Sequence, residues 1–338
     1  MTRGAAGYAL GAAAAGLLLV MAGTLLQPRA IPHAVLSVLV LFCAWPVGCL
    51  LLLFAHALTG GRWGSAVRPG LRAGLVSLFA VPVLAVPVAL MLPGLYPWAR
   101  AEGAALPNHA WLNLPFFAGR AAVYLLCWLG LGLLAARSRH VAGWAPAALI
   151  ALALSWTFAS IDLVLSLEPH FTSSVFGMLS LAGAAVLALS LAVLLSPDPG
   201  RDRSNDLGKL LLGLAVLWAY LDFMQLLIVW QSDLVKQVPW YAARSFGGPG
   251  IVAGAVALGH TVVPFFVLLS SRLRRSVAVL RAVAALMVGS EVLRTWWLVL
   301  PASDRRFGAL DLGCLLLAGG LVTFAALRRA AREGTVHD

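Results

Sequence analysis

The stretch from Ser155 to Gly177 reads SWTFASIDLVLSLEPHFTSSVFG, and it separates two long apolar runs. It holds three ionisable residues, Asp162, Glu168 and His170, in a chain of which only 11% is charged. Apolar runs of about 20 residues are typical of helices that cross a bilayer. The stretch therefore predicts a polar turn between two membrane-spanning helices.

Pro169 indicates where that turn lies. Proline disfavours helix at the preceding residue and breaks a helix that continues through it. We therefore expect one helix to end near Leu167 and the next to begin at Pro169, with His170 in its first turn. Two interpretations of the turn remain open: a polar connection at a membrane surface, or a functional cluster.

The whole chain shares the apolar character of these two runs. Its 338 residues are 61% hydrophobic, with a mean hydropathy of +0.92, which is typical of a polytopic membrane protein. The net charge of +11 does not indicate nucleic-acid binding, because membrane proteins collect arginine in their loops. We predict an all-α membrane protein, a single domain over 1–338. Its ten spans are expected at about 8–26, 34–58, 72–92, 115–136, 143–167, 172–195, 207–230, 249–270, 277–299 and 309–327.

Arginine and lysine are divided unevenly between the two sets of loops. The set that includes both termini holds 15, and the other set holds 6. Because these residues accumulate on the cytoplasmic side, we expect both termini in the cytoplasm and the Glu168–His170 turn outside. The 15 are Arg3, Arg62, Arg68, Arg72, Arg137, Arg139, Arg201, Arg203, Lys209, Arg272, Arg274, Arg275, Arg328, Arg329 and Arg332.

Polar side chains within the predicted spans are candidate functional residues. An acid at the membrane midplane costs about 2.5–3.5 kcal/mol on insertion scales, so Asp222 should face the protein interior with a polar partner. Gln225 lies three residues on along the same stripe, and His260 is expected on the next helix. Pro264 would free the carbonyl of His260, which predicts a polar pocket there. A structural hydrogen bond remains the alternative for each residue.

The ninth predicted span carries a second charged pair. Glu291 and Arg294 are three residues apart, with the acid first, which favours an ion pair within the helix. Arg120 and Asp311 are expected near helix ends, where they could reach the surface.

No motif predicts a metal or a covalently attached cofactor. The four cysteines, Cys43, Cys49, Cys127 and Cys314, all lie in apolar runs, and the sequence holds no CxxCH motif. The best histidine pair for a haem, His56 and His260, lies at unequal depths. We expect no haem, iron–sulfur cluster or other metal in this chain.

Ordered motifs over residues 145–302 resemble the ActF subunit of alternative complex III, part of the NrfD/PsrC-like group of quinone-interacting membrane proteins. The first 140 residues resemble it only in the number and pattern of helices. The motifs are Ser160-Ile-Asp162, Ser166-Leu-Glu168-Pro169-His170, Phe176-Gly177, Asp206-Leu-Gly-Lys209, Trp218-Ala-Tyr220 with Phe223, Gln225 and Trp230, Pro239-Trp-Tyr241 with Arg244, Gly259-His260 with Pro264-Phe265 and Leu269-Ser270, and Trp297-Leu-Val-Leu-Pro301.

The resemblance implies a fold of two four-helix bundles and two flanking helices. It also implies a subunit of the bacterial inner membrane, within a complex that oxidises quinol and passes electrons to iron–sulfur and cytochrome c subunits. The expected partners are those subunits, an NrfD-like sister subunit and lipid, and not nucleic acid. The candidate residues for proton transfer or a quinone site are Asp162, Glu168, His170, Asp222, Gln225, His260, Glu291 and Arg294.

We further expect Asp162, Glu168 and His170 to form an outward-facing proton exit, because quinol oxidation releases protons and histidine titrates near pH 6.5. The sequence departs from the family pattern at several of these positions. Glu291 and Arg294 replace an expected His and Asp, and Asp222 is additional. Leu163 and Phe171 replace an aromatic residue and a Trp. Two other functions stay open: a secondary transporter with a site at broken helices, and a structural anchor for outer redox subunits.

Overall fold

The computed structural model describes residues 2–100, 106, 108–137, 141–232, 235–303, 305 and 307–334. Within these ranges the chain is helical and contains no strand, so the predicted all-α membrane fold is confirmed. Nine of the described helical segments are long and apolar enough to cross a membrane. The one predicted span not among these nine is the ninth, which corresponds to α14, Val277–Val299, and carries Glu291 and Arg294.

The long helices follow the apolar runs of the sequence, and shorter helices lie between them. They are α1 Thr2–Leu26, α2 Ile31–Thr59, α3 Arg62–Gly74, α4 Ser77–Leu90, α5 Leu92–Leu95, α6 Leu114–Arg137, α7 Val141–Leu163, α8 Phe176–Leu195, α9 Gly200–Gln231, α10 Val238–Ser245, α11 Gly247–Val256, α12 Val263–Leu269, α13 Ser271–Arg274, α14 Val277–Val299 and α15 Ala309–Gly334. A π-helix, Ala257–Val262, joins α11 to α12.

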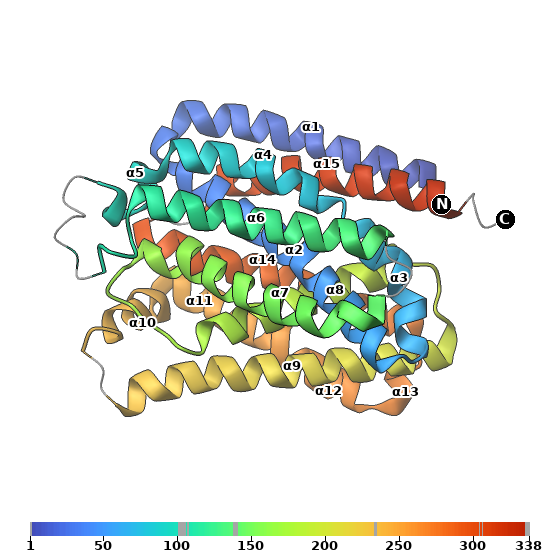
Figure 1. Ribbon diagram of the computed structural model, residues 1–338. Coiled ribbons are helices and arrows are strands. Elements are labelled where there is room, and N and C mark those ends of the chain that lie inside the picture. Colours follow the sequence, from blue (N-terminus) through green and yellow to red (C-terminus); the bar gives the residue numbers. More distant parts are fainter. Residues whose placement is uncertain are drawn as a thin grey trace.

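The spans form two four-helix bundles with a flanking pair. The first bundle contains α2, α4, α6 and α7, and the second contains α8, α9, α11–α12 and α14. Helices α2 and α8 pack against each other where the bundles meet, while α1 and α15 pack along one side (Figure 1). Helix α1 begins and α15 ends at the end of the molecule that carries α3 and α13, opposite α5 and α10 (Figure 1).

Small residues set how closely the bundles approach. A Cβ at Gly48 of α2 would overlap the carbonyl of Ala184 on α8, so only glycine permits this contact. On the flank, a Cβ at Gly16 of α1 would overlap the backbone of α15. Close approach through small residues is a usual basis of helix association in membranes, where lipid removes the hydrophobic driving force.

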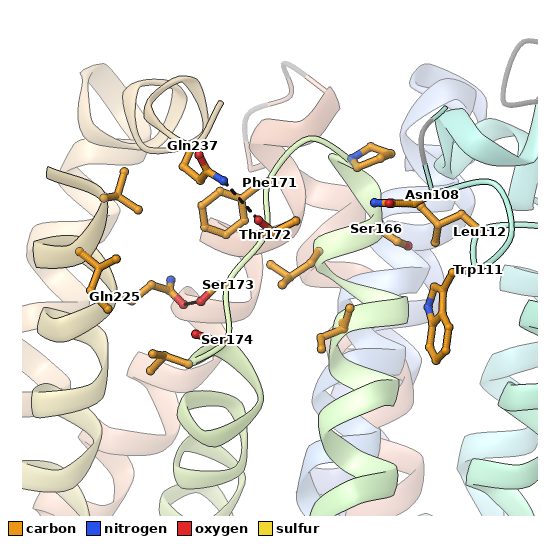
Figure 2. A pocket seen from close by; sticks show the side chains of 16 residues that line it. Asn108, Trp111, Leu112, Ser166, Phe171, Thr172, Ser173, Ser174, Gln225 and Gln237 are labelled. Atoms are coloured by element: carbon orange, nitrogen blue, oxygen red, sulfur yellow. Dashed lines mark hydrogen bonds between the residues drawn. The ribbon is translucent and has the colours of Figure 1, made fainter. Parts of the chain in front are cut away.

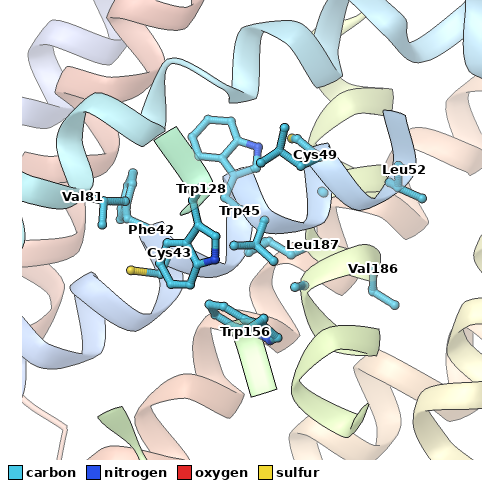
Figure 3. Close-up of a cluster of buried hydrophobic side chains, with 14 of the residues drawn as sticks. Phe42, Cys43, Trp45, Cys49, Leu52, Val81, Trp128, Trp156, Val186 and Leu187 are labelled. Atoms are coloured by element: carbon cyan, nitrogen blue, oxygen red, sulfur yellow. The ribbon is translucent and has the colours of Figure 1, made fainter. Parts of the chain in front are cut away.

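The core of the first bundle is aromatic. Trp45 of α2, Trp128 of α6 and Trp156 of α7 are buried together with Phe42 and Cys43 (Figure 3). The rings of Trp128 and Trp156 lie 5.8 Å apart, and the Trp128 indole donates to Ser155 Oγ at 3.0 Å. These rings hold α2, α6 and α7 in fixed positions.

Two predicted boundaries are wrong. Helix α7 ends at Leu163, a short 3₁₀ turn covers Leu165–Leu167, and α8 begins only at Phe176. His170 therefore lies in a hydrogen-bonded turn over 168–171, where Phe171 N donates to the Glu168 carbonyl, and not in the first turn of a helix. The third span begins ten residues earlier than expected, at Arg62, and its irregularity is the turn at 75–76 between α3 and α4. Pro82 and Pro87 lie inside α4 without ending it.

Candidate functional site

A pocket lies where the end of α7, the 169–175 connection and the end of α9 meet the loop before α6. Its volume is about 700 Å³, which is within the range of small-molecule sites. Figure 2 shows the lining side chains converging from these segments. None of them is charged: Asn108, Trp111, Leu112, Ile161, Leu165, Ser166, Pro169, Phe171, Thr172, Ser173, Ser174, Val175, Gln225, Ile228, Val229 and Gln237. We refer to this cavity as the Trp111–Gln225 pocket.

One wall of the pocket carries a short hydrogen-bond chain. Ser173 Oγ donates to Gln225 Oε1 at 2.8 Å, and Gln225 Nε2 donates to the Tyr241 hydroxyl at 3.2 Å. Burial raises the pKa of Tyr241 to about 12. The tyrosine therefore stays neutral at ordinary pH, and the predicted site residue Gln225 is fixed in orientation by partners on both sides.

The opposite wall rests on Asp162, which is 1% exposed. Arg120 of α6 binds its carboxylate with two nitrogens, Nε to Oδ2 at 2.8 Å and Nη2 to Oδ1 at 2.9 Å. The Tyr124 hydroxyl donates to Oδ2 at 2.9 Å, and the Trp111 indole donates to Oδ1 at 3.0 Å. Each oxygen thus has two donors. The carboxylate is held as a structural anion, and through Trp111 it shapes the pocket wall.

Arg120 is tied to the same loop. Its Nη1 donates to the Trp111 carbonyl at 2.9 Å, and its guanidinium carbon lies 4.0 Å from the centre of the Trp111 ring. The cation–π contact and the hydrogen bond together hold Trp111 against α6. The expectation that Arg120 reaches the surface is wrong, because its side chain is turned inward and paired.

Glu168 and His170 have different surroundings from Asp162. Glu168 accepts from Arg244 Nη2 at 2.5 Å, and Arg244 also donates to the carbonyls of Trp240 and Leu298. Burial lowers the pKa of Arg244, and the contact with Glu168 opposes that shift. His170 is exposed beside Pro169, which lines the pocket. The structure therefore does not bring the three residues of the expected proton exit together.

A second polar cluster lies inside the second bundle. Arg294 Nη1 of α14 contacts Asp222 Oδ1 of α9 at 2.7 Å, and His260 Nε2 contacts Glu291 Oε1 at 2.7 Å. The Trp218 ring lies between the two pairs, 4.0 Å from the His260 ring and 4.9 Å from the Arg294 guanidinium carbon. We call these five residues the α9–α14 cluster.

The π-helix positions the histidine of this cluster. His260 belongs to Ala257–Val262 and is fully buried, so the extra residue in that turn directs its ring toward α14. A Cβ at Gly183 would stand 2.9 Å from Glu291 Oε1, so the absence of a side chain there leaves room for the carboxylate.

The pairing differs from the sequence expectation in two respects. Glu291 and Arg294 do not pair with each other, since each binds a residue on a neighbouring helix. Asp222 has a polar partner, as expected, but that partner is Arg294 rather than Gln225 or His260. Arg294 and Asp222, both departures from the family pattern, contact each other, so the additional acid compensates the arginine.

Several residues of the site were not predicted as functional. Trp111 and Tyr124 carry no charge to draw attention, and Arg244 lies in a loop segment. Arg120 gave a usable signal, because an arginine six residues inside an apolar span usually has a partner. Asp311, also expected near the surface, is fully buried and contacts Arg305 at 3.2 Å.

Comparison with known proteins does not assign the chain to a family. No family model matches the sequence, and no curated protein matches it significantly. Within the described residues no group of three His, Cys, Asp or Glu side chains is arranged to hold a metal ion.

Proposed function

We propose that this chain is the membrane subunit of a quinol-oxidising respiratory complex similar to alternative complex III, and that the Trp111–Gln225 pocket receives the quinol head. The observation that carries the proposal is the pocket itself. It holds about 700 Å³ and is lined by uncharged side chains, with amides and hydroxyls beside apolar groups. A quinol is a neutral ring with two polar oxygens and an apolar tail, so it suits such a lining.

Charged ligands suit the pocket poorly. A nucleotide or a carboxylic acid would lose its hydration without gaining an ion pair from any lining side chain. The nearest charges, Arg120 and Asp162, are already bonded to each other behind Trp111. Gln225 and Ser173 can exchange their mutual hydrogen bond for bonds to a quinol oxygen.

The roles of neighbouring residues follow from their contacts. Asp162 and Arg120 hold Trp111 in the wall, while His170 stays exposed next to the lining residue Pro169. We therefore assign proton acceptance at the pocket mouth to His170. Electrons from the quinol would pass to iron–sulfur and cytochrome c subunits of the complex, which are the partners that the family resemblance implies. The complex would lie in the bacterial inner membrane with both termini of this chain cytoplasmic.

The hydrogen bonds of Arg244 support a role as a structural anchor. Arg244 joins the 168–171 turn, α10 and the end of α14 into a rigid surface on which an outer subunit could dock. A transporter has less support. The π-helix at 257–262 keeps its helical bonds, and in the turn at 75–76 the backbone groups bond to residues three positions away, so neither segment frees unwound backbone for an ion.

Quinone binding to the purified chain tests the proposal. Titration with a short-tailed quinone should quench tryptophan fluorescence, because Trp111 lies in the pocket wall. Gln225→Leu should weaken binding about fivefold, the value of one hydrogen bond. Gln231→Leu, at the exposed end of the same helix, is the control and should bind as the wild type does. Equal binding by Gln225→Leu and wild type would place the quinone elsewhere, and no binding by the wild type would leave the anchor role.

The proposed role of His170 is tested by measuring the turnover of the assembled complex. In the assembled complex, His170→Asn should reduce quinol oxidation, because asparagine cannot accept the proton that the neutral imidazole accepts. Unchanged turnover from pH 5.5 to 8.5, about one to two units either side of a free histidine, would exclude His170 as the acceptor.

A further inference from the structure

The amphipathic helix α3 carries a row of arginines on its exposed face. Arg62, Arg68 and Arg72 are exposed, while Gly64, Ala66, Val67, Gly70, Leu71, Ala73 and Gly74 are buried against the rest of the protein. Arg62 contacts Asp206 at 3.4 Å. Arg68 and Arg72 form no ion pair or hydrogen bond with the part of the chain that the structure describes. They are four residues apart, where like charges repel on a helix.

Helix α3 is firmly held, so its arginines are presented in fixed positions. Two successive glycines with positive φ, Gly60 and Gly61, turn the chain back at the end of α2. The His56 ring packs where a Gly64 side chain would be and contacts the Gly61 carbonyl at 3.0 Å. Further along, Gly70 N donates to Ser196 Oγ at 3.1 Å. A rigid platform lowers the entropy lost when a ligand binds to it.

Arg137 reaches the same level from α6. Leu78 of α4 packs against Gly132 of α6, and the two helices run in opposite directions (Figure 1). Arg72 precedes Leu78 by six residues and Arg137 follows Gly132 by five. Arg72 lies in the last turn of α3 and Arg137 in the last turn of α6, so both arginines lie toward the end of the molecule that carries α3 (Figure 1). Arg137 is exposed and bonds to nothing in the described chain.

An exposed apolar surface continues from the arginines along both helices. The side chains on α4 are Phe79, Val83 and Val86, 61%, 71% and 58% exposed, and those on α6 are Val123, Leu126 and Leu134, 62%, 70% and 53% exposed. Cations at the end of an apolar column match the two parts of a phospholipid, a phosphate and its acyl chains. A soluble phosphate would contact only the arginines and leave the apolar surface uncovered.

We propose that Arg68, Arg72 and Arg137 bind the phosphate of an anionic phospholipid whose acyl chains lie along α4 and α6. Arginine presents several donors in a planar fork that matches phosphate oxygens. A bound phosphate removes the repulsion between Arg68 and Arg72. An anionic lipid fits better than a zwitterionic one, because three arginines without an ion pair in the described chain lie at this end of the molecule. The proposal is independent of the quinol site at the opposite end of the bundle.

Native mass spectrometry of the purified full-length chain tests this proposal. Titration with phosphatidylglycerol should show a tightly retained lipid, bound at least tenfold better than phosphatidylcholine. Arg68→Gln with Arg72→Gln should weaken phosphatidylglycerol binding at least about tenfold, since each arginine at a membrane surface contributes about fivefold. Arg272→Gln with Arg275→Gln removes two exposed arginines at the same end of the molecule and should bind the lipid normally.

Three results would overturn the proposal. An equal loss of phosphatidylglycerol affinity in the two double variants would mean that the lipid is attracted by the net charge of this end of the molecule and not by a specific site. Undiminished binding by the α3 variant would exclude these arginines. Competition by millimolar inorganic phosphate, as effective as added lipid, would indicate a soluble-anion site. If the glutamine variant fails to fold, Arg68→Lys with Arg72→Lys keeps the charges but not the planar forks, so it should bind phosphatidylglycerol more weakly than the wild type. Undiminished binding by the lysine variant would overturn the assignment of the phosphate to the arginine forks.

Discussion

Asp162 illustrates how completely a single charge can be enclosed. Its two oxygens accept from Arg120, Tyr124 and Trp111, and the Ser166 hydroxyl donates to its backbone carbonyl at 2.5 Å. A buried ion pair of this kind adds little net stability over apolar residues, but removing one partner leaves the other charge uncompensated. The pair therefore specifies where Trp111 lies, and with it the shape of the pocket.

Asp162→Asn should be strongly destabilising for this reason. We expect a loss of about 3–5 kcal/mol, since Arg120 would be left buried without its counter-ion. Asp206→Asn, which breaks the exposed contact with Arg62, is the matched control and should cost less than about 1 kcal/mol. Denaturation of the two purified variants measures the difference. Similar losses for both would show that the Arg120–Asp162 pair is solvated.

Because of Tyr241, the stability of the folded protein should depend on pH in the alkaline range. Its pKa is raised from 10.0 to about 12 by burial, so the neutral form is favoured in the folded protein. The resulting stability is complete below pH 10 and is lost as the pH rises from 10 to 12, amounting to up to about 2 kcal/mol. Tyr241→Phe cannot ionise, so between pH 10 and 12 it should lose less stability than the wild type. Parallel losses would indicate that Tyr241 ionises as freely as a tyrosine in water.

At the scale of helices, the bonding of backbone groups explains both where the predicted helices agree with the structure and where they differ from it. Apolar runs of span length predicted the long helices, because a bilayer requires every backbone group to be bonded internally. Pro169 correctly marked a break, but the residues after it form a turn and an irregular connection, and the next helix begins only at Phe176. The π-helix at His260 was not predicted, although Pro264 pointed to that place, because an inserted residue leaves no signal in hydrophobic periodicity.

A substitution at Gly48 tests how closely helices α2 and α8 pack where the two bundles meet. Gly48→Ala should force α2 and α8 apart, since its Cβ would meet the Ala184 carbonyl, a backbone atom that cannot move aside alone. We expect destabilisation by about 1–3 kcal/mol. Gly130→Ala on α6 meets no atom within 4 Å and should be neutral or slightly stabilising. Thermal melting compares the two variants, and equal melting temperatures would place α2 and α8 further apart than described.

For the whole molecule, fold class and candidate residues were easier to predict than their partners. Charges in apolar helices marked Asp162, Asp222, His260, Glu291 and Arg294 correctly as residues with a special environment. Their pairing depends on which helices become neighbours, and a single sequence does not contain that information. The polar wall of the pocket was unpredictable for the same reason, because Ser173, Gln225 and Tyr241 meet only after three separate segments pack together.

The arrangement of the chain in the membrane follows from loop charge. We expect the 168–175 connection outside and both termini in the cytoplasm. In a variant without native cysteines, Thr172→Cys should react with an impermeant thiol reagent in intact cells. A cysteine at Arg201, exposed in the first turn of α9 at the opposite end, should react only after lysis. The reverse pattern would invert the orientation.

The most direct test of the proposed function is to locate a bound quinone. A short-tailed quinone carrying a photoreactive azide would be bound to the intact complex, illuminated, and mapped by peptide mass spectrometry. We predict adducts on the 161–175 and 225–229 segments and on Gln237, which line the Trp111–Gln225 pocket, and their loss when unlabelled quinone is in excess. Competed adducts on this chain only outside those segments, or only on other subunits, would contradict a quinol site in this pocket.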